Sequence, residues 1–540
     1  MPLPEGGATP WPPQHCEAIN RQLATWGAWY AGDVEQLAGI YGGGGAGDTT
    51  GFFASETGGR VRNAVNSVVA KVRRWFWSSQ ASATQNRTRL HVPIASDIAS
   101  ASSDLLFSEP PTITIEAPEV AEGETPAPNP TQERLDKLVD DGAHAAWLEA
   151  AELCAALGGV YLRIVWDVSV KDKPWITAIY PDRAVPEWKF DQLSSVIFWR
   201  VIHTKGKLVV RHLECHEPGK IIHGVYAGTN DELGMPIPLT DYPATANLAN
   251  DQLVNGNEVP TGATGLTARY VPNMRPNRVW RNVPEAANLG RSDFSGVEPL
   301  MDALDLVESS LIRDVDLGKA RLILSSELLQ SNGPGGGASV DLDREVYEGI
   351  NSMTAEDGKA DITQVQFKIR VDEHLRTKVD LQSTIVGNAG YSPQTFGLNG
   401  DVAVTATEVA AKNRRSLITR DRKIRYWRPE LAEILYSLLQ VDAKWFNSGI
   451  VPSKPLIVFP DGVSVDPKAQ AETLNLLHQA GAISTEEKVR TLHPDWPVDK
   501  VLAEVDKITG PPLEDPGTFT GNPPPGSDYE DPEGDQPPAI

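Results

Sequence analysis

The chain has 540 residues, of which 40% are hydrophobic and 22% charged, and its formal net charge is -23. This length exceeds what one hydrophobic core serves, so several substructures with a large buried interior are expected. The negative charge argues against a tight, sequence-specific DNA-binding protein, because such binding depends on Lys and Arg side chains that displace counterions from phosphates.

The cysteines and the apolar stretches indicate the kind of cellular compartment in which the protein is expected. Cys16, Cys154 and Cys215 are widely spaced and contain no CxxC pair, so neither a disulfide framework nor a cysteine zinc site is indicated. A reducing compartment fits this pattern. The first residues lack the basic and apolar regions of a signal peptide, and charged residues interrupt the most apolar stretch, 150–166. We therefore expect no signal peptide and no membrane span.

The first half of the chain predicts helices mixed with strands. A helix over 94–107 ends before two consecutive prolines, and a second helix over 131–157 is stopped by Gly158 and Gly159. Runs rich in β-branched and aromatic residues then predict strands at 160–166, 175–180, 196–203, 207–216 and 221–226. The last two strands should pair through the turn at 217–219. An α+β region is expected here.

The middle of the chain predicts two helices separated by a strand-and-loop segment. Over 296–318 an apolar stripe recurs at helical spacing, and carboxylates occupy the other faces. Short strands at 321–324 and 363–369 flank a glycine-rich loop, and a second helix covers 371–388.

The last third predicts one long helix followed by shorter ones. Thr405 and Glu408 form a capping box, from which a helix can run to about residue 440, with a kink near Arg425 to Pro429. Further helices are expected at 467–480, 484–492 and 497–508. Residues 510–540 contain no Lys or Arg and too few apolar residues for a core, which predicts a disordered acidic tail.

The motifs of common enzyme classes are missing. The loop from Gly333 to Gly337 is not followed by the Gly-Lys-Ser/Thr of a nucleotide-binding P-loop, and the chain has neither GxSxG nor HExxH. His212, Cys215 and His216 are close in sequence, but strand alternation sends His212 and Cys215 to opposite faces. We expect no catalytic activity, no cofactor and no metal.

Two charged clusters allow more than one interpretation. Asp302, Asp305 and Glu308 on the 296–318 helix could form a solvated face, an acidic wall of a channel, or a magnesium site in a nucleic-acid-processing enzyme. A basic cluster on the long helix could contact nucleic acid or pair with carboxylates of a neighbouring subunit. Its candidate residues are Lys412, Arg414, Arg415, Arg422 and Arg425.

Several segments, taken in order, resemble the portal family of tailed double-stranded-DNA bacteriophages, in the branch typical of long-tailed actinobacterial viruses. The likeness spans about residues 60 to 508. The segments that carry it are RLHVPIASDIA at 89–99, DLLFSEPP at 104–111, YPDRAVPEW at 180–188, SSLIRDVDLGKAR at 309–321, GYSPQTFG at 390–397, TATE at 405–408 and HPDW at 493–496.

The resemblance implies an α+β, mainly helical portal fold whose copies form a ring, usually of twelve. Its parts would be an N-terminal extension (1–60), the wing (61–295), stem helix 1 (296–318), the clip (319–370), stem helix 2 (371–390), the tunnel loop (391–404), the long kinked wing helix (405–445), the crown (446–509) and the tail (510–540). The tunnel-loop residues expected to face DNA are Gly397, Leu398, Asn399, Gly400, Asp401 and Val402.

The implied function is a channel at one capsid vertex, through which double-stranded DNA passes without sequence preference during packaging and ejection. The implied partners are further copies of the chain, the large terminase subunit, the head-to-tail adaptor, and the major capsid and scaffolding proteins. The protein would be part of the virion and would assemble in the host cytoplasm. Another structural or connector protein of the phage head, or a metal-dependent nucleic-acid-processing enzyme, are the alternatives.

Overall fold

The computed structural model describes residues 3–42, 90–116, 129–140, 142–246, 248, 253–317, 321–323, 330–331, 338–339, 363–365, 370–398, 406–460, 467–493, 496 and 498–509. The chain divides into two compact units, Met1–Gly462 and Val463–Ile540. The end of the expected N-terminal extension, the first part of the expected wing, most of the clip, the end of the tunnel loop and the acidic tail lie outside the described residues.

The larger sheet of the first unit is antiparallel and follows the order β1-β9-β8-β7-β6-β5, with β10 paired to β8. Its strands are β1 (Gly7–Pro10), β5 (Ala184–Lys189), β6 (Gln192–Lys205), β7 (Leu208–Glu217), β8 (Lys220–Gly228), β9 (Glu232–Ile237) and β10 (Glu258–Pro260). The predicted pairing of β7 with β8 is confirmed: Glu217 lies opposite Lys220, and Gly219 takes the positive φ that the turn needs.

A smaller sheet lies under two helices. Strands β3 (Gly159–Val165), β4 (Trp175–Ile179) and β11 (Ala268–Pro272) pair antiparallel in the order β11-β3-β4. Helix α6 (Ala143–Leu157) packs on β3 and β4 and against α4 (Ile94–Phe107). The α6–β3 junction needs Gly158, whose φ is 83° and whose surroundings leave no space for a side chain. The predicted α+β fold is confirmed.

Three further helices and one strand pair complete this part of the first unit. Helix α1 (Glu17–Ala31) buries Trp26 and Trp29 in the main core, and α2 (Val34–Gly42) follows it. Helix α5 (Pro130–Val139) begins at Asn129, whose side chain caps the first turn. Strand β2 (Thr112–Thr114) pairs with β16 (Leu456–Val458), which ties two distant parts of the chain together.

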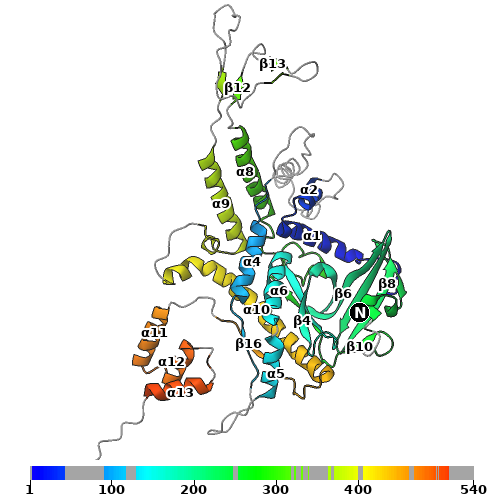
Figure 1. The fold of residues 1–540 in the computed structure, drawn as a ribbon, viewed down its shortest axis with the longest axis vertical. Coiled ribbons are helices and arrows are strands. Elements are labelled where there is room, and N and C mark those ends of the chain that lie inside the picture. The colour runs from blue at the N-terminus through cyan, green and yellow to red at the C-terminus, as the bar shows by residue number, and fades with distance from the viewer. Residues whose placement is uncertain are drawn as a thin grey trace, which may run out of the picture. The chain divides into compact units, whose positions relative to one another are not determined.

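Helices α8 (Glu298–Leu317) and α9 (Val371–Ala389) pack side by side, and Figure 1 shows β12 beyond their ends. Strand β12 (Arg321–Ile323) pairs with β15 (Thr363–Val365), and β13 (Gln330–Ser331) with β14 (Ala338–Ser339). Both helices agree with the predicted ranges to within two residues. We call this pair the α8–α9 hairpin.

Helix α10 (Ala406–Trp445) is 40 residues long and continues through Pro429. The helix contacts α4, β16 and strands β3 and β11 of the smaller sheet, and Leu431, Ile434, Leu435 and Leu438 of its second half are buried. Burial of these side chains supplies the stabilisation that offsets the backbone donor missing at proline. The predicted extent of the helix is confirmed, and the kink stays a prediction.

The second unit contains three helices, α11 (Pro467–Gln479), α12 (Thr485–Leu492) and α13 (Val498–Thr509), in agreement with the prediction. Ser484 caps α12 by accepting a hydrogen bond from the amide of Glu487. His493 stacks on Trp496 with ring centroids 3.9 Å apart. None of the helices that the structure describes has the length and apolarity to cross a membrane.

Candidate functional site

The segment after α9 forms a tight connection to α10. Gly390 ends α9 with φ of 103°, and Pro393–Phe396 form a single turn of 3-10 helix, η8, which ends at Gly397 with φ of 69°. A Cβ on Gly390 would approach the Thr419 hydroxyl to 3.0 Å, so a larger residue would be both strained and crowded here. Both glycines are needed for the chain to turn twice within eight residues.

One face of α10 holds this connection in place. Asn413, Ser416, Thr419 and Lys423 recur at spacings of three and four residues and therefore share a face. The Thr419 hydroxyl donates to the carbonyl of Gly390 at 2.6 Å, and the Ser416 hydroxyl accepts from the amide of Ser392 at 2.9 Å.

Thr395 adds a third attachment to the same face. Its hydroxyl oxygen lies 2.8 Å from that of Ser416, and it donates to the Asn413 side-chain oxygen at 3.3 Å. The connection is therefore attached to α10 at three residues, over about two helical turns.

A buried ion pair continues this face one turn further. The Lys423 ammonium lies 2.5 Å from an Asp293 oxygen, and the two side chains are 2% and 1% exposed. Lys423 also donates to the hydroxyls of Ser102 at 2.5 Å and Tyr391 at 3.0 Å. Asp293 accepts from the Tyr391 hydroxyl at 2.7 Å and from the Asn273 amide group at 2.8 Å.

This network, which we call the Lys423 junction, joins α4, the segment before α8, the end of α9 and α10. Burial and the neighbouring Asp293 raise the pKa of Tyr391 well above its usual value, so Tyr391 remains a hydrogen-bond donor. Every charged group is paired and hydrogen-bonded, which is the condition under which a charge is tolerated in a core. The junction gives the predicted tunnel loop a rigid base.

The structure describes only two of the six expected tunnel-loop residues. Leu398 is half-buried against the main core, and its amide donates to the carbonyl of Pro393 at 3.1 Å, whereas Gly397 is exposed. Asn399, Gly400, Asp401 and Val402 lie outside the described residues. The assignment of a DNA-facing loop therefore stays a prediction.

The acidic candidates on α8 face the protein rather than solvent. Asp305 is 1% exposed and accepts hydrogen bonds from His91 Nδ1 at 2.8 Å and from the amide of Val92 at 2.9 Å. Asp302 is also buried, and Glu308 is paired with Lys378 of α9. The expectation that these three carboxylates line a channel or form a solvated face conflicts with these surroundings, because buried and paired carboxylates present little charge outward.

Burial also changes the titration of one of these carboxylates. It raises the pKa of Asp305, and the hydrogen bond from His91 acts in the opposite direction. Asp305 therefore attaches α8 to the segment before α4. The same helix carries Asp314, which sequence reasoning passed over and which pairs with Arg370 and His374.

The candidate basic residues lie on several sides of α10, because helical spacing places Arg414 and Arg425 opposite Lys423 but Lys412 on the same face as Lys423. Arg414, Arg415, Arg422 and Arg425 are exposed, and within the part of the chain that the structure describes none of them forms an ion pair. Lys412 is half-buried. Contact of these residues with nucleic acid or with carboxylates of a neighbouring subunit stays a prediction.

The histidine cluster of the larger sheet is a different arrangement from a metal site. His212 Nε2 lies 3.1 Å from His223 Nδ1, with the two rings stacked, and His216 contacts Thr267 and Glu214. Burial lowers the pKa of His212 to about 3 and lowers that of His223, so both are neutral. Among the described residues, no group of three or more His, Cys, Asp or Glu side chains could hold a metal ion.

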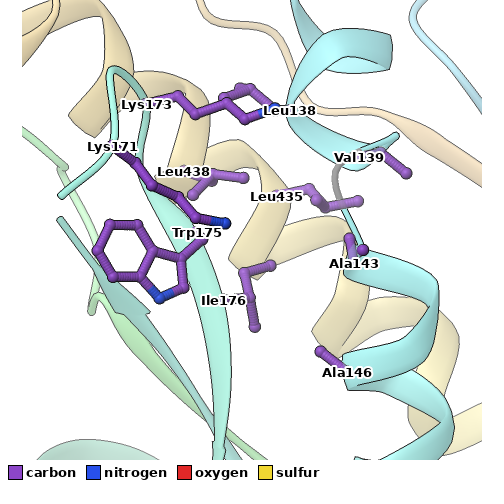
Figure 2. Close-up of a pocket in the computed structure, with 11 residues that line it drawn as sticks. Leu138, Val139, Ala143, Ala146, Lys171, Lys173, Trp175, Ile176, Leu435 and Leu438 are labelled. Carbon is purple, nitrogen blue, oxygen red and sulfur yellow. The ribbon is translucent and has the colours of Figure 1, made fainter.

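A shallow cleft between α5, α6, β4 and α10 is the clearest hollow in the described surface (Figure 2). Leu138, Ile176, Leu435 and Leu438 provide apolar walls, and Lys171 and Lys173 lie at one side. The lining contains no carboxylate and no histidine, and its only ionisable side chains are those of Lys171 and Lys173.

Comparison with known proteins identifies the family. The family model described as "Phage portal protein, SPP1 Gp6-like" matches residues 60–509. The chain belongs to the phage portal protein family. This membership confirms the resemblance drawn from the sequence segments and gives the chain a portal or connector role in a phage particle. No curated protein matches the chain.

Three solved structures are similar to this portal protein. A chain of "Virion of native gene transfer agent (GTA) particle" is 13% identical with a TM-score of 0.33, covering 75% of this chain and 91% of that chain. Chains of "Neck of empty GTA particle computed with C6 symmetry" and "Neck of native GTA particle computed with C12 symmetry" are 13% and 14% identical, with TM-scores of 0.34 and 0.31. They cover 74% and 67% of this chain, and 90% and 89% of those chains.

Sequence reasoning found the helices of this portal protein but missed the Lys423 junction. Lys423 lies within the basic stretch of the long helix, but helical spacing places it with Ser416 and Thr419 rather than with Arg422 and Arg425. Its partner Asp293 stands 130 residues away, and no local pattern connects the two.

Proposed function

We propose that this portal protein assembles into a ring of twelve copies at one capsid vertex and forms the channel for double-stranded DNA during packaging and ejection. The family match over residues 60–509 carries this proposal. The α8–α9 hairpin supplies a rigid helical pair suited to a repeated wall, and the Lys423 junction supplies a fixed base for the loop between η8 and α10. DNA would pass this loop through steric contact, without sequence readout.

The same proposal assigns no catalysis to the chain. ATP hydrolysis belongs to a separate large terminase subunit that docks on the ring, and after packaging the head-to-tail adaptor binds there. The major capsid and scaffolding proteins surround the ring during assembly in the host cytoplasm. The alternative of a magnesium-dependent enzyme relied on Asp302, Asp305 and Glu308, but Asp305 binds His91 and Glu308 binds Lys378.

The first test is the mass and symmetry of the purified full-length protein. Mass photometry and class averages from negative-stain electron microscopy should show rings of about a dozen subunits with a central hole. A monomer that persists at high concentration and with scaffolding protein present would overturn the ring.

The second test concerns catalysis. ATPase and nuclease assays with Mg²⁺ or Mn²⁺ should show no turnover above buffer, and turnover that copurifies with the ring would contradict the passive channel.

A further inference from the structure

The outer part of the α8–α9 hairpin has an inverted distribution of polarity. Where the helices face each other, Asp314 pairs with His374 and Glu308 with Lys378, and the side chains of Asp314, Glu308 and His374 are only 17%, 13% and 13% exposed. On the outside of α9, Val371, Leu375 and Val379 are 42%, 46% and 42% exposed. The two carboxylates and His374 are thus more buried than the three aliphatic side chains, although Arg370, the other partner of Asp314, is 62% exposed. Exposed aliphatic residues in a row are not expected on a helix whose outer face meets only water.

The three aliphatic residues form one continuous face, which we call the α9 stripe. They recur every fourth residue, so their side chains lie above one another along the helix. Seven residues after Val379 the same face reaches Val386, which is fully buried in the main core. The stripe is therefore the uncovered continuation of a face that already packs against protein at its other end.

We propose that the α9 stripe packs against helix α8 of a second copy of this chain. The proposal rests on the ring proposed above and names one of its subunit contacts. Covering three adjacent aliphatic side chains removes apolar surface from water, so the contact favours assembly. In a ring every copy would contribute α9 to one neighbour and α8 to the other, which is the head-to-tail arrangement that closes by rotation.

Charge complementarity supports a second copy as the occupant. Asp372 is exposed and borders the stripe one turn before Leu375, and Arg313 is exposed on α8. In the part of the chain that the structure describes, neither forms an ion pair. Asp314, the neighbour of Arg313 in the sequence, binds Arg370 and His374. Asp372 lies between those two residues in α9, so Arg313 and Asp372 are at the same height along the hairpin. Adjacent copies at equal height would bring Arg313 close to the neighbour's acidic edge.

Substitution of Leu375 tests the stripe directly. Leu375→Asp should abolish rings in mass photometry, while circular dichroism and the melting temperature of the protomer stay near those of the parent, because Leu375 is exposed there. Thr377→Asp is the matched control, since Thr377 is exposed on the same helix, outside the stripe, and receives the same charge. It should leave the rings intact. Normal rings from the Leu375→Asp protein would overturn the contact while leaving the ring itself in place.

An exchange of charges identifies the occupant. Arg313→Glu and Asp372→Arg alone should each raise the concentration for half-maximal assembly by roughly tenfold, and the double variant should recover most of that loss. A double variant no better than either single one would overturn the pairing with a second copy. Rings that form normally but no longer bind adaptor or scaffolding protein would instead assign the stripe to that partner. Absence of rings from the parent protein would refute both this contact and the proposed function.

Discussion

The Lys423 junction and the α8–α9 hairpin both hold opposite charges between helices, but they do so in different surroundings. At the junction, Lys423 and Asp293 are at most 2% exposed, and each finds all its partners within one copy of the chain. In the hairpin, the ion pairs are partly open to solvent and aliphatic side chains face outward. The junction is complete in the single protein, whereas the hairpin has a surface that needs a partner.

This difference assigns different energetic roles to similar contacts. A charge that loses its partner in the core cannot be rehydrated, so the junction should be sensitive to every substitution that unbalances it. A charge at the hairpin can return to water when its partner is removed. The junction thus sets the stability of the single subunit, and the hairpin sets how subunits meet.

The largest effect should come from Lys423→Met, which leaves Asp293 buried without its counter-ion. We expect the free energy of unfolding to fall by about 3–5 kcal/mol, measured by urea denaturation followed by tryptophan fluorescence. Arg425→Ala is the control, because Arg425 is exposed on the opposite side of the same helix, and it should change stability by less than about 0.5 kcal/mol. Equal losses of unfolding free energy in the two variants would contradict the distinction between buried and exposed charges.

The stacked histidines extend the comparison to the larger sheet. Burial lowers the pKa of His212 to about 3, below its usual value near 6.5, so the folded protein does not take up the proton that the unfolded chain binds. The stabilisation by neutral His212 is therefore present above about pH 6.5 and is lost progressively as the pH falls, by about 2 kcal/mol at pH 5. The unfolding free energy measured from pH 7 to pH 5 should show this slope.

Replacement of the titrating group provides the control for this pH dependence. His212→Gln keeps a polar side chain next to His223 but cannot take up a proton, so its unfolding free energy should fall less steeply between pH 7 and pH 5. An unchanged slope in the variant would mean that other groups govern the acid sensitivity of the sheet.

Local patterns were sufficient for the elements but not for the contacts between them. The stripe of α8, the glycines after α6 and the turn between β7 and β8 each depend on residues within a few positions of one another, and all were predicted. The acidic residues of α8 allowed three interpretations, because helical spacing alone cannot show that His91, 214 residues away, binds Asp305. Long-range pairing is decided by the fold as a whole.

The α9 stripe is a second feature that the sequence alone does not explain. Val371, Leu375 and Val379 have the spacing of a buried helix face, and only the structure shows that this face is uncovered in the single chain while Asp314 and Glu308 are turned inward. The spacing of these residues does not by itself identify what packs against them, and in our proposal that partner is a second copy of the chain.

A smaller effect is expected at the attachment of η8 to α10. Thr419→Ala removes the hydrogen bond from the buried Thr419 hydroxyl to the carbonyl of Gly390 and should cost about 1 kcal/mol. Hydrogen exchange of the Tyr391 amide, which is bonded to the carbonyl of Val386, should become faster. Thr384→Ala, at an exposed position of α9, should leave that amide unchanged. Equal exchange in both variants would contradict the idea that α10 fixes the base of the loop.

The smallest effect should follow from Asp314→Asn in the hairpin. Burial tends to raise the pKa of Asp314, but the hydrogen bonds from His374 and Arg370 outweigh it and hold the pKa below its usual value. The paired carboxylate therefore stabilises the fold above about pH 4, and this contribution is lost as the pH falls further. Because the pair is solvent-accessible, the substitution should cost less than about 1 kcal/mol at pH 7, and less still in 1 M salt. A loss of unfolding free energy as large as that of Lys423→Met, unchanged by salt, would mean that ion pairs stabilise the hairpin as strongly as they stabilise the core. The α9 stripe would then not be needed to stabilise the hairpin in a ring.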